Sequence, residues 1–64
     1  MAPFKDIRDL IRELTKDGPV KTMTIYDGAI AKDIPPEVAR AIVLEMTKAG
    51  IIFSPKKGYV EWLD

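Results

Sequence analysis

The chain has 64 residues, with ten basic and ten acidic side chains, no cysteine and no histidine. So short a chain forms one domain at most and buries only about 60% of its unfolded surface. The missing residue types exclude disulfides, thiolate metal sites and histidine-based catalysis, and the zero net charge argues against strong autonomous binding of nucleic acid.

Three helices are predicted in chain order, over residues 3–16, 25–32 and 36–49. Apolar residues recur at helical spacing in each of these segments. Gly18-Pro19 follows the first segment and Gly50 follows the third, so both segments end where a helix commonly stops.

The second of these helices has the least regular sequence. Residues 20–23 before it are β-leaning and predict a short strand. Thr24 is expected to cap the helix, with Asp27 in the place that Glu or Gln takes in a capping box. The side chains expected to face inward are Ile25, Ala29 and Ile30.

Residues 51–63 change from helical to strand-like spacing and predict a β-hairpin around Pro55 and Gly58. Because strand faces alternate, Phe53 and Tyr59 are expected to share the outer face of the hairpin. The side chains expected to face inward are Ile52, Val60 and Trp62, with Trp62 closing the core.

The order helix, short strand, helix, helix, hairpin predicts an α+β fold that is mainly α. It is the order of a winged helix-turn-helix domain, here spanning residues 1–64, with three helices, a short strand and a two-stranded wing. The side chains expected to be buried together are Ile7, Leu10, Leu14, Ile30, Ile42, Met46, Ile52, Val60 and Trp62.

The C-terminal third of the chain carries a more specific pattern, in which the informative residues are Gly50, Ile52, Phe53, Pro55, Gly58, Tyr59 and Val60. This pattern resembles the hairpin of the last domain of archaeal MCM replicative helicases, which is a winged helix. Ser54 departs from the family, where an acidic residue usually precedes the proline. The turn at residues 33–35 and the helix after it are also similar to the family.

The resemblance implies a domain tethered beside an ATP-dependent DNA helicase, whose ATPase and unwinding it modulates. The partners it implies are the parent AAA+ core in cis and other replication proteins. The zero net charge and the uncharged centre of the third helix predict that DNA is bound only weakly and without sequence preference. The alternative is a free-standing winged-helix transcriptional regulator, which would normally dimerise to reach two half-sites.

The chain itself is expected to be non-catalytic, with no metal site and no cofactor. Ser54 and the threonines have no histidine that could activate them as nucleophiles. No glycine-rich loop ending in Lys-Ser or Lys-Thr is present to bind phosphates. An ATPase motor would therefore have to lie elsewhere in a parent protein.

Two groups of residues are candidates for binding DNA. Arg40 and Lys48 lie on the outward side of the third helix, which is the helix that enters the major groove in helix-turn-helix proteins. Lys56 and Lys57 at the hairpin tip are better placed for phosphates, although a solvated turn explains them equally well.

Leu44, Phe53 and Tyr59 are candidates for a protein-interaction patch, with packing against a neighbouring loop as the alternative. No apolar run is long enough to span a membrane, and the N-terminal sequence lacks the apolar core of a signal peptide. A cytoplasmic, nucleoid-associated protein without membrane partners is expected.

Overall fold

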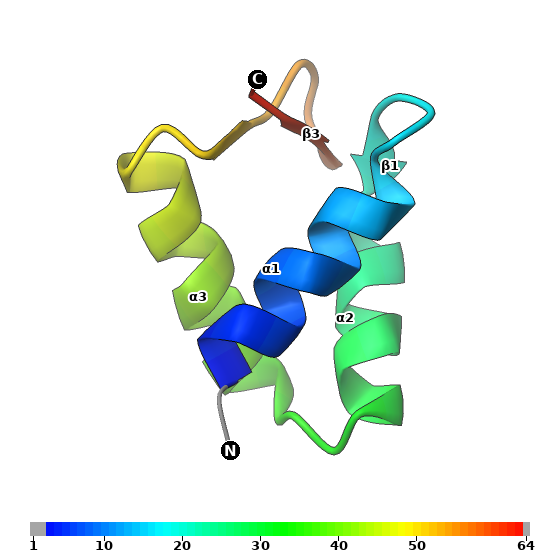
Figure 1. Cartoon of the computed structure of the whole chain (residues 1–64), viewed down its shortest axis with the longest axis vertical. Coiled ribbons are helices and arrows are strands. Elements are labelled where there is room, and N and C mark those ends of the chain that lie inside the picture. Colours follow the sequence, from blue (N-terminus) through cyan, green and yellow to red (C-terminus); the bar gives the residue numbers. More distant parts are fainter. Residues whose placement is uncertain (1–2, 64) are drawn as a thin grey trace.

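The computed structural model describes residues 3–63, which form three helices and a three-stranded antiparallel sheet (Figure 1). The helices are α1 (Pro3–Leu14), α2 (Thr22–Ala31) and α3 (Pro36–Lys48). The strands are β1 (Val20–Lys21), β2 (Ile52–Phe53) and β3 (Tyr59–Trp62). The predicted element order and the mainly helical α+β character are confirmed. Met1, Ala2 and Asp64, which the predicted domain includes, lie outside the described residues.

The three helices pack against one another in every pair, and the sheet lies at one end of them (Figure 1). Among the side chains predicted to be buried together, Leu10, Leu14 and Trp62 are only partly buried. Those found in the core are Ile7, Ile42, Met46, Ile52 and Val60. Burial of these apolar side chains is the main source of stability for so small a domain.

The prediction that Ile30 faces inward is wrong, because its side chain is 55% exposed. Ile25 and Ala29 lie about one helical turn apart and form the buried side of α2. Ile30 follows Ala29 by one residue and is therefore rotated by about 100° from it, toward the surface.

The predicted start of α2 is also wrong, because the helix begins at Thr22 rather than at residue 25. Its N-cap residue is Lys21, no side chain makes a cap hydrogen bond there, and Thr24 and Asp27 both lie inside the helix. The Thr22 N–H instead donates to the Gly58 carbonyl oxygen at 2.9 Å. The first turn of a helix leaves N–H groups unpaired, and here the hairpin supplies an acceptor that the local sequence does not contain.

α1 ends at Leu14, two residues before its predicted end. The hydroxyl of the buried Thr15 donates to the Ile11 carbonyl oxygen at 2.7 Å. The chain then turns through Gly18, whose φ of 128° is accessible to glycine, so the prediction that Gly18-Pro19 ends this helical segment is confirmed.

α3 ends at Lys48, one residue before its predicted end, and Gly50 adopts a φ of 76°. The Gly50 N–H donates to the Thr47 carbonyl oxygen at 3.1 Å, and the Ile51 N–H donates to that of Met46 at 3.0 Å. This pair of bonds is a Schellman motif, which satisfies carbonyl groups at the helix end. It also sets the direction in which the chain leaves α3 toward β2.

The sheet has the strand order β1-β3-β2, so β3 is the central strand. β2 and β3 form the predicted hairpin, and β1 pairs with the other edge of β3. Trp62 lies opposite the buried Ile52 and packs against the core, with the Arg12 guanidinium 5.4 Å from its ring centroid. In residues 3–63, no helix has the length and apolar character that a membrane crossing needs.

Candidate functional site

The hairpin loop, residues 54–58, is fixed by hydrogen bonds within the turn. The Ser54 hydroxyl donates to the Lys56 carbonyl oxygen at 2.8 Å, and the Tyr59 N–H donates to the same oxygen at 3.1 Å. Gly58 has a φ of 84°, a left-handed conformation that other residues rarely adopt. The lysines of the loop therefore project from an ordered turn.

Two residues predicted for different roles meet at this loop. The Lys56 ammonium, a predicted DNA contact, lies 4.3 Å from the ring centroid of Tyr59, a predicted protein contact. Lys21 lies opposite Tyr59 in the register of β1 and β3, so its side chain lies on the same face of the sheet as the Tyr59 ring. Lys57, the other predicted phosphate contact of the loop, is exposed. Lys21 was not among the site residues predicted from the sequence, although its alternation with Val20 was a signal that it faces outward.

The predicted contacts on α3 form a separate group. Arg40, Leu44 and Lys48 are spaced by four residues, so they lie along one side of the helix, and all are exposed. Glu37 and Glu45 are exposed on the same helix and dilute its positive charge. No hydrogen bond or ion pair among residues 3–63 joins this side of α3 to the hairpin loop.

The predicted protein-interaction residues are divided between the sheet and α3. Phe53 is 37% exposed and lies opposite Glu61, which is two residues after Tyr59 on β3. Strand alternation therefore places Phe53 and Tyr59 on one face of the sheet, as predicted. Leu44 is 54% exposed and lies on α3.

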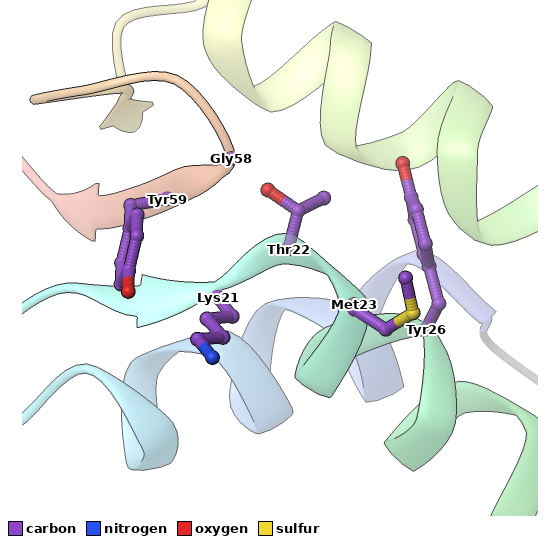
Figure 2. A pocket seen from close by; sticks show the side chains of 6 residues that line it. All are labelled: Lys21, Thr22, Met23, Tyr26, Gly58 and Tyr59. Atoms are coloured by element: carbon purple, nitrogen blue, oxygen red, sulfur yellow. The ribbon is translucent and has the colours of Figure 1, made fainter.

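A groove of about 420 Å³ lies between the start of α2 and the hairpin. Figure 2 shows Tyr59 beside Lys21 on one side of it, Met23 and Tyr26 on the other, and Thr22 between them. Apart from Tyr59, sequence reasoning missed these residues. The hydrogen bond from the Thr22 N–H to the Gly58 carbonyl oxygen brings the two sides of the groove together. These two residues lie far apart in the chain, so the sequence does not indicate that they meet.

The ion pairs of the described residues are concentrated at α1 and do not involve the hairpin. Every ion pair within residues 3–63 lies within α1 or joins α1 to the turn directly after it. The Asp9 carboxylate contacts Lys5 at 3.3 Å and Arg8 at 3.4 Å. Desolvation is the largest single influence and raises the pKa of Asp9, but the hydrogen bonds and charges of Lys5 and Arg8 together outweigh it and leave the pKa below its ordinary value. The lysines around the hairpin have no such carboxylate partner in this part of the chain.

Residues 3–63 contain no cluster of three or more acidic, histidine or cysteine side chains arranged to hold a metal ion. Comparison of the chain with family models, with curated proteins and with solved structures found no match. The candidate site itself consists of exposed cations, a cation–aromatic pair and an apolar groove.

Proposed function

We propose that the chain is a winged helix-turn-helix domain that contacts DNA weakly and without sequence preference, and that acts in cis on a helicase of the archaeal MCM type. The observation that carries the proposal is the ordered hairpin loop, which presents Lys56 and Lys57 with no carboxylate partner among residues 3–63. Lysines in such positions bind phosphates without reading sequence.

The mixed charge of α3 supports weak rather than specific binding. Arg40 and Lys48 are available, but Leu44 lies between them and two glutamates are exposed on the same helix. Nonspecific affinities at physiological salt are typically about 10⁻⁴ to 10⁻⁶ M. If all four predicted cations contact phosphates, a plot of the logarithm of the association constant against the logarithm of the salt concentration has a slope of about −3.6. Each phosphate contact contributes about −0.9 to this slope.

A role in cis makes so weak a contact useful. A short flexible linker gives an effective concentration in about the millimolar range, which compensates for low affinity. A contact that differs between two states of a motor then shifts the balance between those states. The similarity of the hairpin to archaeal MCM proteins supports a replicative helicase as that motor.

Fluorescence anisotropy of the chain with labelled duplexes of unrelated sequence tests the DNA contact. We expect weak, salt-sensitive binding that is equal for all sequences and is reduced by Lys57→Ala. Lys32→Ala is the matched control, because Lys32 is an exposed lysine at the opposite end of α2 from the hairpin contact. Equal loss in both variants, or no binding at millimolar protein, would contradict the proposed hairpin contact.

The second candidate is a free-standing transcriptional regulator. Arg40 on the exposed side of α3 favours it, because arginine reads guanine bidentately in the major groove. Nanomolar binding to one sequence, lost in Arg40→Ala, would support this candidate over the first.

A further inference from the structure

We propose that the groove between α2 and the hairpin loop binds an apolar side chain of an acidic peptide segment from a partner protein. This inference goes beyond the proposed DNA contact, because it assigns a different class of ligand to a neighbouring groove, which shares only its rim residue Lys56 with that contact. It stands on the shape of the groove, the chemistry of its lining and the charge at its rim.

The volume of about 420 Å³ lies within the range of about 300–1,000 Å³ that is usual for ligand pockets. The groove is lined by Lys21, Thr22, Met23, Tyr26, Gly58 and Tyr59. Met23 is 68% exposed, which makes it the most exposed of the large apolar side chains in the described part of the chain. Methionine adapts its shape to a ligand, and both methionine and tyrosine are enriched where proteins meet.

The walls of the groove are held in place before any ligand arrives. The hydrogen bond from the Thr22 N–H to the Gly58 carbonyl oxygen, at 2.9 Å, joins α2 to the hairpin. Tyr26 is partly buried and packs against the core, and this packing holds its ring in place at the groove. A preformed groove lowers the ordering cost of binding. Figure 2 shows the rings of Tyr26 and Tyr59 standing on opposite sides of the opening.

The rim of the groove is cationic and lacks its counter-charge. Lys21 lines the groove, and the Lys56 ammonium lies over the Tyr59 ring at 4.3 Å. Asp27 and Glu61 are the nearest acidic residues along α2 and β3, but neither forms an ion pair within the described residues. Carboxylates of a ligand would pair with these lysines and would steer the approach of the ligand to the groove.

The apolar lining favours a peptide over nucleic acid at this site. A nucleotide could stack on Tyr59, but the groove offers few polar groups for base edges, and Met23 adds nothing to phosphate binding. Binding of an apolar side chain is favoured in proportion to the apolar surface that it buries against this lining. We therefore assign the groove to a peptide and the exposed Lys57 to DNA.

The test uses a synthetic peptide with a central Leu-Phe-Leu segment flanked on both sides by glutamates. Two comparison peptides replace either the central segment by alanines or the glutamates by lysines. Binding is followed by fluorescence anisotropy, and backbone amide chemical shifts of the isotope-labelled chain locate the site. We expect only the first peptide to bind, with the largest shifts at Met23, Tyr26 and Gly58.

Met23→Ala is expected to weaken peptide binding by about tenfold, because a methionine side chain loses its contact with the ligand. Ile30→Ala is the matched control: it removes an exposed apolar side chain from the same helix but outside the groove, and it should leave affinity unchanged. Lys21→Ala should weaken binding by about threefold and reduce its dependence on salt.

Three results would overturn the proposal. They are binding of the alanine peptide as tight as that of the first peptide, equal loss in Met23→Ala and Ile30→Ala, and no binding by any peptide. Displacement of the peptide by a short oligothymidylate, together with loss of oligothymidylate binding in Met23→Ala, would reassign the groove to nucleic acid. Retained duplex binding in Met23→Ala leaves the proposed DNA function intact, so the two proposals fail separately.

Discussion

The Lys56 ammonium lies 4.3 Å from the centroid of the Tyr59 ring, so a cation and an aromatic residue of the hairpin form one surface. Exposed pairs of this kind contribute about 0.5–1 kcal/mol. A double-mutant cycle with Lys56→Gln and Tyr59→Leu, measured by denaturant unfolding, should give a coupling of that size. The cycle of Lys57→Gln with Tyr59→Leu is the control and should give almost none. Equal coupling in the two cycles would contradict the pairing.

Trp62→Ala should lower the free energy of unfolding by about 2–3 kcal/mol, less than the 3–5 kcal/mol typical of a fully buried aromatic. The ring packs against the core but is only partly buried, and Arg12 covers it at 5.4 Å. Urea unfolding followed by circular dichroism measures the loss. A change below about 1 kcal/mol would show that the ring does not support the core.

Gly28→Ala should change stability little, because two effects oppose each other. Alanine is favoured over glycine inside a helix by about 1 kcal/mol. However, the added Cβ would lie 2.8 Å from Cδ2 of Leu10 and would force that side chain to move. In a Leu10→Ala background the obstacle is gone, and Gly28→Ala should then stabilise by about 1 kcal/mol. Equal effects in the two backgrounds would rule out the close contact between α1 and α2.

Asp33→Gly should stabilise the domain by about 0.5–1 kcal/mol, because Asp33 has a φ of 61° just after α2. The Asp33 N–H donates to the Ile30 carbonyl oxygen at 3.0 Å, and the Ile34 N–H donates to the Ala29 carbonyl oxygen at 2.9 Å. These two hydrogen bonds satisfy carbonyl groups at the end of the helix. Thermal unfolding measures the gain. Asp27→Gly, inside the same helix, is the control and should destabilise; a loss in both variants would contradict the account.

The parts of the fold that local signals determine could be predicted from the sequence. The helical spacing of apolar residues located α1 and α3, and Gly50 marked the end of α3. The start of α2 could not be predicted, because its acceptor is Gly58, far along the chain. The packing of Gly28 against Leu10 depends on a contact between helices in the same way.

The candidate site shows the same division between local and long-range information. The exposure of Lys56 and Lys57 follows from a turn that proline and glycine indicate within a few residues. The groove needs β1, α2 and the hairpin together, so no pattern in the sequence indicated that Lys21 and Met23 line one site, although strand alternation places Lys21 on the surface. Leu44 was correctly placed outside the core, because helical periodicity alone determines its side of α3.

The proposed regulation in cis is tested most directly by deleting residues 4–64 from the proposed parent helicase and measuring steady-state ATP hydrolysis and DNA unwinding. The account predicts that at least one rate changes while the hexamer stays intact by sedimentation, because the domain acts through contacts rather than chemistry. Lys57→Ala in the full-length helicase should reproduce the DNA-dependent part of that change. Identical ATPase and unwinding rates with and without the domain, over a range of salt and DNA substrates, would contradict the proposed regulation.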